Sequence, residues 1–479
     1  MQMRFFQLLF LCVLVHSIYA QTDRAVQAEI DAVENHLLKG LQIKGDSIEH
    51  YNIYDRMEHY KVPGVSIAIV KDGELRWAKG YGMANTIEET SVDANTLFQA
   101  GSISKPVAAL AALKLYEEGQ LDFDADVNSY LEGWQIPSSD YTASEKVTIR
   151  RLLTHTGGTT VHGFPGYAQK DSFPTIEQVL SGDGNTEAVL LDTVPGSLWR
   201  YSGGGYTIME KAVEDVSGQS LDDFLEEHVF ASLGMSNSTY EQPISERYQQ
   251  NISAAYDGRG SIIEGLWHNY PEQAAAGLWT TPTDLAKYCI EVQEIANGKE
   301  GGILKSNTVA EMLTKHDNDW GLGPSLRFEK DSLTFGHGGK NAGFTNNMIA
   351  SVHQGHALII MTNADNGGKI INEVQNAIEE VYGWPVGRMR TIDIIDLKDE
   401  ILATYVGKYK LKGQGLTVTF NLTDGQLSAI TPIGILRLSP MGDQRFIDLT
   451  TETMIEFQGE EEIEGFRVGN GMAFEKVME

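Results

Sequence analysis

The sequence predicts an α/β fold: an antiparallel sheet flanked by helices plus an all-helical subdomain, followed by a small all-β C-terminal domain. Two observations lead to this prediction. Strand patterns at 64–80 return only at 333–362, with mostly helix and loop patterns between them, so strands from both ends can form one sheet. Beyond residue 400, hydrophobic and polar residues alternate with period two between turn signals, which is typical of a meander or partial barrel.

The N-terminal segment is typical of a secretory signal peptide. Arg4 provides the positive start, 5–15 the apolar stretch, and Ser17–Ala20 a cleavage site. The apolar stretch is too short to span a membrane, and no later segment reaches about 18 apolar residues. We expect residues 1–20 to be removed and the protein to be secreted or periplasmic, without membrane insertion. Cys289 is then the only cysteine, which excludes an intrachain disulfide.

The elements of the main domain follow from local patterns. Residues 22–60 carry apolar positions at helical spacing and predict helix. A buried strand, a hairpin turn and a returning strand are predicted next, at Gly64–Val70, Lys71–Glu74 and Leu75–Gly80. The run 105–115 is rich in helix formers, so it predicts a helix.

The second half of the chain predicts strands, a helix, a linker and more strands. Strands are expected at Leu333–His337, Phe344–Val352 and Ala357–Thr362, a helix at Ile370–Tyr382, and a linker at Pro385–Asp399. Asp424-Gly425 and Asn470-Gly471 are typical hairpin turns. We therefore expect a domain over 21–390 and a β-rich domain over 400–479.

Composition narrows the class of partner. The chain has 479 residues, and 37 Lys and Arg against 66 Asp and Glu give a formal net charge of −29. Such an acidic excess argues against nucleic acid or an anionic membrane as a partner. No spacing of His and Cys is typical of zinc, and no glycine pattern predicts a dinucleotide site, so we expect no metal and no cofactor. The sequence leaves the oligomeric state open.

A candidate nucleophile and a candidate base lie at the start of the 105–115 helix. In Ser102-Ile103-Ser104-Lys105 the serine and the lysine are three residues apart, so they share a helix face. A serine hydroxyl becomes a good nucleophile when a neighbour takes its proton, and a lysine can do so when burial lowers its pKa. The alternative is a chance match with a solvated lysine.

Two glycine-rich motifs follow. Tyr201-Ser202-Gly203-Gly204-Gly205-Tyr206 can bring a phenol beside a reacting group, and Tyr201 would then shuttle protons to a leaving group. Gly336-His337-Gly338-Gly339-Lys340 ends a predicted strand, where a free N–H can pair with that of Ser102 to hold an oxyanion. The alternatives are a packed aromatic residue and an incidental histidine in a glycine turn.

Together the three motifs resemble the serine β-lactamase and penicillin-binding protein superfamily, above all its class C-like branch with D-aminopeptidase-like and esterase-like members. The resemblance covers roughly residues 30–385. Ser102–Lys105 matches the first motif, Tyr201-Ser202-Gly203 the second, and His337-Gly338-Gly339 the third. The stretches 152–158 and 277–285 are also similar to the family, and the first of these makes His155 look structural.

The resemblance implies a β-lactamase/transpeptidase-like fold and acyl transfer through an acyl-enzyme on Ser102. Lys105, with Tyr201, would take the serine proton. Tyr201, assisted by Lys105 and His337, would protonate the leaving group and then serve as base for the water that deacylates the enzyme. Lys340, Gly338, Gly339 and Gly203 are expected at the oxyanion and substrate-binding site, with the N–H groups of Ser102 and Lys340 facing the oxyanion.

Two departures from the family pattern bear on the substrate. Gly203 stands where the family often has Asn, and His337 replaces the lysine typical of β-lactamases. A neutral imidazole attracts a substrate carboxylate less than an ammonium does. Lys340 supplies the missing charge only if its side chain turns inward. Aromatic residues of two loops are candidate cleft walls, or else ordinary packing: Phe164, Tyr167, Phe173, Tyr256, Trp267 and Tyr270.

The sequence thus predicts an exported serine hydrolase that cleaves ester or amide bonds of a small-molecule or peptide substrate, as an esterase or D-amino-acid peptidase. One alternative is a β-lactamase or D-alanyl-D-alanine carboxypeptidase. A second is a non-catalytic binding protein on the same fold, with the β domain as its interaction module.

Overall fold

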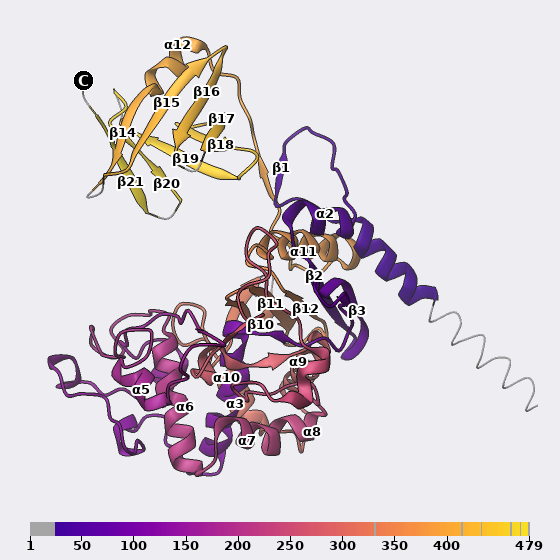
Figure 1. Ribbon diagram of the computed structural model, residues 1–479, viewed down its shortest axis with the longest axis vertical. Coiled ribbons are helices and arrows are strands. Elements are labelled where there is room, and N and C mark those ends of the chain that lie inside the picture. Colours follow the sequence, from indigo (N-terminus) through magenta and orange to yellow (C-terminus); the bar gives the residue numbers. More distant parts are fainter. Residues whose placement is uncertain are drawn as a thin grey trace, which may run out of the picture. The chain divides into compact units, whose positions relative to one another are not determined.

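The computed structural model describes residues 24–329, 332–412, 415–432, 434–459, 462–469 and 471–477. The signal peptide expected at 1–20 lies outside the described residues. The chain divides into two compact units (Figure 1). One comprises Tyr51–Val386 with the segment up to Leu37, and the other comprises Gly387–Glu479 with Leu38–His50.

The region near the N-terminus differs from the single helix expected over 22–60. Residues 24–35 are helical, but β1 (Leu41–Ile43) follows, and helix resumes only at α2 (Ile53–Tyr60). Strand β1 pairs in parallel with β13 (Arg390–Ile392), so a strand also interrupts the linker predicted at 385–399. Because the partners are far apart in the sequence, local periodicity carried no sign of this pairing.

A seven-stranded antiparallel sheet forms the centre of the first unit (Figure 1). Its order is β4-β3-β2-β12-β11-β10-β9, so strands from both ends of the domain meet where β2 pairs with β12. In chain order the strands are β2 (Gly64–Lys71), β3 (Glu74–Asn85), β4 (Thr90–Ser91), β9 (Ser325–Glu329), β10 (Ser332–Asn341), β11 (Phe344–Ser351) and β12 (Ala357–Thr362). The predicted antiparallel sheet is confirmed.

Both faces of this sheet are covered, which explains why β2 is apolar along its length. Val65, Ile67 and Ile69 pack with α2 and α11 (Gly368–Tyr382) on one face. Ala68 and Val70 pack on the other face, in the cluster that contains α3 (Ser104–Glu117) and α9 (Pro282–Ala296). The sheet is therefore the middle layer of the unit.

The predicted helical subdomain lies between β4 and β9 in the chain. Besides α3 and α9 it contains α4 (Ile149–Leu153), α5 (Ile176–Ser181), α6 (Gly203–Ser217), α7 (Leu221–Leu225), α8 (Ala231–Leu233) and α10 (Ser306–Met312). Short strand pairs join its loops: β5 (Phe98–Gln99) with β8 (Trp279–Thr280), and β6 (Tyr167–Ala168) with β7 (His268–Asn269). Most of α3 is buried, since its alanine-rich sequence lets neighbouring elements approach on all sides.

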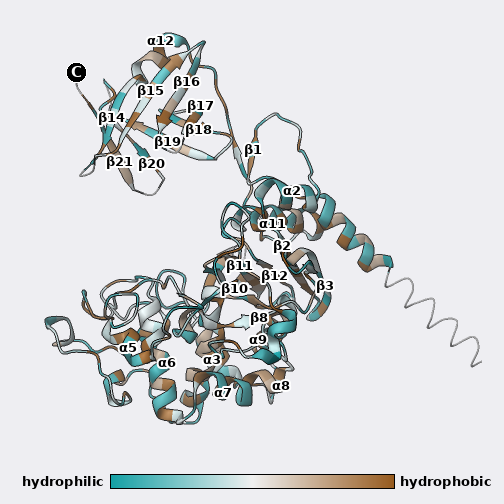
Figure 2. Cartoon of the chain, viewed as in Figure 1, coloured by the Kyte–Doolittle hydropathy of each residue, from teal (hydrophilic) through white to brown (hydrophobic). Residues whose placement is uncertain are grey.

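The second unit contains a closed antiparallel barrel of eight strands. Its strands are β14 (Gly407–Leu411), β15 (Thr417–Thr423), β16 (Gln426–Thr431), β17 (Gly434–Gly442), β18 (Arg445–Asp448), β19 (Thr453–Gln458), β20 (Gly465–Val468) and β21 (Met472–Lys476). Helix α12 (Asp399–Leu402) precedes them. Hydrophobic and hydrophilic residues alternate along the strands in Figure 2. The predicted β domain is confirmed, and β14 pairs with β21 to close it.

Candidate active site

Ser102 lies in a short 3-10 turn, Gly101–Ile103, that runs directly into α3. Ser104 fixes this junction, because its hydroxyl donates to the carbonyl of Gly101 at 2.6 Å and accepts from the N–H of Leu278 at 3.0 Å. The side chain of Lys105 points back to the junction, with Nζ 3.2 Å from Oγ of Ser102. The helix thus brings together the two residues of the first motif, as the i, i+3 spacing predicts.

The environment of Lys105 is unusual for an ammonium group. The residue is 2% exposed, and burial lowers its pKa from about 10.5 to about 7. Nζ also donates to the carbonyl of Ala275 at 2.8 Å, in a helical turn (Gln273–Gly277) that precedes β8. A large fraction of Lys105 is therefore an uncharged amine at neutral pH, next to a hydroxyl.

Tyr201, which precedes α6, lies beside the same amine. Nζ of Lys105 is 4.9 Å from the centroid of the Tyr201 ring. The phenol is buried, and its hydroxyl makes no hydrogen bond of good geometry with a described residue, although it lies near the hydroxyl of Ser102. Burial raises the pKa of Tyr201 above its ordinary value, while the nearby Ser102 hydroxyl lowers it by less. The phenol therefore keeps its proton at neutral pH.

His337 reaches the site from β10. Its ring centroid is 6.0 Å from that of Tyr201. Burial, and to a smaller extent the charge of Lys105, lowers the pKa of His337 to about 3, so the imidazole is neutral. Nδ1 contacts the carbonyl of Gly338 and must carry the proton there, which leaves Nε2 as an acceptor. The described residues offer this buried Nε2 no partner.

Strand β10 continues past His337 and touches the turn that holds Ser102. Gly101 has φ +57°, and a Cβ on it would stand 2.5 Å from the main-chain N of Lys340. A Cβ on Gly339 would stand 1.9 Å from the carbonyl O of Ala100. Only glycine allows two backbones to approach this closely. The N–H groups of Ser102 and Lys340 are therefore carried on neighbouring backbone segments.

The side chain of Lys340 turns away from this contact. It is 61% exposed, and Nζ donates to the carbonyl of Asp365 at 2.8 Å. Of the two orientations left open by the sequence, the structure has the outward one. Gly338, two residues earlier, has open space on the side where a side chain would project. The nearest atom to a Cβ built there would be the carbonyl O of Asn346, at 3.9 Å.

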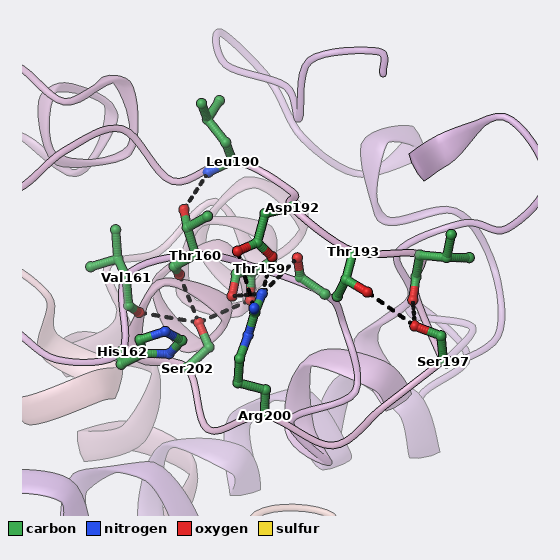
Figure 3. Close-up of polar contacts among 12 residues, drawn as sticks. Thr159, Thr160, Val161, His162, Leu190, Asp192, Thr193, Ser197, Arg200 and Ser202 are labelled. Atoms are coloured by element: carbon green, nitrogen blue, oxygen red, sulfur yellow. Dashed lines mark hydrogen bonds and ion pairs between the residues drawn. The ribbon is translucent and has the colours of Figure 1, made fainter. Parts of the chain in front are cut away.

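Hydrogen bonds hold the second motif against the loop 158–162 (Figure 3). The hydroxyl of Ser202 caps α6 by accepting from the N–H of Gly205 at 3.0 Å. It also donates to the carbonyl of Thr160 at 3.0 Å. Arg200 forms an ion pair with Asp192 in the same view. The hydroxyl of Ser202 is therefore engaged in holding the motif together, whereas the phenol of Tyr201 lies beside Lys105 and Ser102.

Gly203 is enclosed on the side where a side chain would project. A Cβ there would stand 2.9 Å from the ring of Phe164 and 3.4 Å from the carbonyl of His162. Phe164 occupies the space that an asparagine side chain would need. Glycine therefore replaces the asparagine of the family pattern at a position where the Phe164 ring leaves no room for a larger side chain.

The other aromatic candidates mostly belong to the core. Tyr256 and Tyr270 are fully buried and Tyr167 nearly so, so for these three the structure has ordinary packing, the second of the two alternatives. Tyr256 accepts from the N–H of Thr86 at 2.8 Å. Phe173 is exposed and Trp267 packs against the core. Loop composition alone did not distinguish a cleft wall from core packing.

Two site residues stand apart from the predicted set. The ring of His155, in a segment that the family resemblance made look structural, packs in a tilted arrangement against that of Tyr201, with ring centroids 4.4 Å apart. No sequence pattern indicated Trp320. Its ring centroid lies 5.4 Å from that of His337 and 6.0 Å from that of Tyr201. Its place in the site depends on the loop between α10 and β9, which has no periodic signal.

The described ranges contain neither a candidate metal cluster nor a candidate membrane-spanning helix. These residues include no group of three or more His, Cys, Asp and Glu side chains placed to hold a metal ion. Among the same residues, no helix combines the length and the apolarity needed to cross a bilayer.

Comparison with known proteins identifies the family to which the chain belongs. The family model described as "Beta-lactamase" matches residues 52–379. A protein of Escherichia coli O157:H7, provisionally named D-alanyl-D-alanine carboxypeptidase, is 26% identical over 72% of this chain and 91% of its own length.

Two solved structures share the fold. The octameric penicillin-binding protein homologue from Pyrococcus abyssi has a TM-score of 0.61 and 22% identity, over 88% of this chain and 98% of its own. The D-amino acid amidase from Ochrobactrum anthropi SV3, complexed with L-phenylalanine amide, has a TM-score of 0.55 and 21% identity, over 69% of this chain and 97% of its own.

Proposed function

This chain belongs to the beta-lactamase family, whose members are serine hydrolases, and from that membership we propose that it cleaves esters or amides through an acyl-enzyme on Ser102. One observation carries the proposal: a buried lysine amine, with its pKa lowered to about 7, lies 3.2 Å from the Ser102 hydroxyl. That arrangement activates a serine nucleophile near neutral pH.

The first step is attack of Oγ of Ser102 on a carbonyl carbon, with transfer of the hydroxyl proton to the uncharged amine of Lys105. The main-chain N–H groups of Ser102 and Lys340 stabilise the resulting oxyanion. The close approach of Gly101 to Lys340 supports this pairing. A donor of this kind typically lowers the barrier by about 3 kcal/mol.

The leaving group then departs with a proton from Tyr201, and Lys105 returns a proton to Tyr201. The raised pKa keeps the phenol protonated at neutral pH, so Tyr201 has a proton to donate and is not available as a base. His337, a neutral acceptor at Nε2, is suited to hold the phenol or a substrate N–H. Because the phenol of Tyr201 keeps its proton, we propose Lys105 as the base that activates the deacylating water. The sequence had suggested Tyr201 for this role.

The charge of the site favours esters and uncharged amides over substrates with a carboxylate. A β-lactam and a D-alanyl-D-alanine end each carry a carboxylate, which a cation in the third motif would attract. Here His337 is neutral and the Lys340 side chain is bonded to Asp365. The Phe164 ring beside Gly203 adds an apolar wall. We therefore place D-amino-acid amides and esters ahead of β-lactams and D-alanyl-D-alanine peptides.

Labelling of the nucleophile tests the enzyme proposal. A fluorophosphonate serine probe should add one adduct to the wild-type protein, as read by intact mass, and Ser102→Ala should remain unlabelled. A wild-type protein that takes up no probe, or equal labelling of the variant, would instead support a non-catalytic binding protein.

A substrate panel tests the preference. kcat/KM should be highest for p-nitrophenyl esters or D-amino-acid anilides and lowest for a chromogenic cephalosporin. Rapid turnover of the cephalosporin together with inert esters would reverse the order and favour a β-lactamase. We also propose export directed by residues 1–20, and the N-terminal sequence of the secreted protein would test it.

A further inference from the structure

His155 has an unusual backbone conformation for a residue other than glycine. It follows α4 with φ +59°, in the left-handed region, and is 2% exposed. For a residue other than glycine this backbone conformation costs roughly 1 kcal/mol or more, and such residues concentrate at functional sites. The proton transfers proposed for Lys105 and Tyr201 do not involve His155.

Its contacts enclose the backbone around Tyr201. The N–H of Arg200 donates to the main-chain carbonyl of His155 at 2.8 Å, and the N–H of Ser202 donates to Nδ1 of His155 at 3.1 Å. The residues immediately before and after Tyr201 are thus bonded to one residue. Because Nδ1 accepts, the proton of the neutral ring is on Nε2.

The imidazole is suited to remain an acceptor. Burial, with a smaller contribution from Lys105, lowers the pKa of His155 well below its ordinary value. Nδ1 is already occupied by the Ser202 N–H, which leaves no lone pair to accept a substrate proton. His155 therefore does not serve as a second base.

The position of the Tyr201 phenol depends on these contacts. The hydroxyl makes no hydrogen bond of good geometry among the described residues, and Ser102, which lies near enough to lower its pKa, is the group it must be aimed at. Its ring is instead held by packing, with His155 at 4.4 Å and Trp320 at 6.0 Å between centroids. The backbone of the motif is the remaining constraint.

We propose that His155 is a positioning residue, whose Nδ1 and carbonyl clamp the backbone on both sides of Tyr201 and so aim the phenol at Oγ of Ser102 and the departing group. This inference rests on the proposed function, since it assigns to the clamp the geometry of the proton transfer from Tyr201.

Two variants distinguish the hydrogen bond accepted by Nδ1 of His155 from the packing of its ring. His155→Asn keeps an acceptor at the same number of bonds from the main chain as Nδ1, and asparagine tolerates the left-handed region. His155→Phe keeps a ring of similar shape but removes the acceptor, so the Ser202 N–H loses its partner. Tyr201→Phe is the reference, because it removes the proton donor itself.

The readout is leaving-group dependence, which general damage to the fold would not change. An alkyl ester expels an alkoxide that needs a proton, whereas the p-nitrophenyl ester of the same acid expels a stable phenolate. A catalytic group displaced by about 1 Å can lose on the order of 100-fold in rate. We expect kcat/KM of His155→Phe to fall by that order for the alkyl ester, and by less than about tenfold for the p-nitrophenyl ester.

His155→Asn should stay within about threefold of wild type on both esters, since the acceptor is kept. In the Tyr201→Phe background, His155→Phe should cause no further selective loss. Equal losses on both esters for His155→Phe, or the same selective loss in His155→Asn, would overturn the clamp while leaving the proposed function intact. A Tyr201→Phe variant with no leaving-group selectivity would overturn the proposed acid and the clamp together.

Discussion

Lys105 shows how burial alone can change the protonation of a side chain. It is part of a helix with little exposed surface, and the desolvation of its ammonium group lowers the pKa. His337 is subject to the same effect, and since burial disfavours its charged form as well, it stays neutral. The site thus holds an amine that titrates near neutrality beside groups that do not.

The pH dependence of acylation follows from Lys105. The uncharged amine is the proposed base and its pKa is about 7, so kcat/KM for a p-nitrophenyl ester should rise with pH and level off above a midpoint near 7. Lys105→Arg keeps a charged group, and kcat/KM should fall by roughly 100-fold or more. Steady-state rates from pH 5 to 9 measure both effects. A flat profile, or a rate that is still rising steeply at pH 9, would contradict this assignment of the base.

At the scale of elements, the site depends on the contact between the Gly101–Ile103 turn and β10. Gly101→Ala would place a Cβ 2.5 Å from the main-chain N of Lys340, on a residue with φ +57°. Gly119→Ala is a matched control, because Gly119 has φ +72° but nothing within 4 Å of its Cβ position.

We expect Gly119→Ala to lower the free energy of unfolding by about 1 kcal/mol through backbone strain, with kcat unchanged. Gly101→Ala should lose more stability, and its kcat should fall by about 100-fold because the two proposed oxyanion donors separate. Urea unfolding and steady-state kinetics compare the two. Equal behaviour of both variants would show that the close approach is unimportant for catalysis.

Elements with a local signal were predicted well. Helix α3, strand β2 and the hairpin after it follow directly from helix formers, a continuous apolar run and an Asp-Gly turn. The β1–β13 pair and β9 were missed, since short strands are defined by their partners. The continuous helix over 22–60 failed for a related reason: periodicity did not reveal the break at 36–52.

At the scale of the whole molecule, each unit has its own hydrophobic core. Phe420, fully buried, packs edge to face with Tyr409, Phe457 and Phe466 inside the barrel, at centroid distances of 5.0 to 5.1 Å. The core clusters of the first unit share no residue with this one. Separate cores predict separate unfolding transitions.

Phe420→Ala should therefore lower the stability of the barrel by about 3–5 kcal/mol, because it leaves a large cavity. In calorimetry one transition should move down while the other stays, and fluorophosphonate labelling of Ser102 should be unchanged. A single transition that shifts as a whole would show that the two units unfold together.

The sequence by itself determined the class of fold, the family resemblance, and the identity of the four residues proposed for catalysis. These depend on patterns within short segments and on the spacing of motifs. Only the tertiary structure decided that Lys105 is buried, that Lys340 turns outward, and that His155 and Trp320 surround Tyr201. Burial and contact arise when segments far apart in the chain pack together, and desolvation, which sets the pKa of the base, exists only in that packed state.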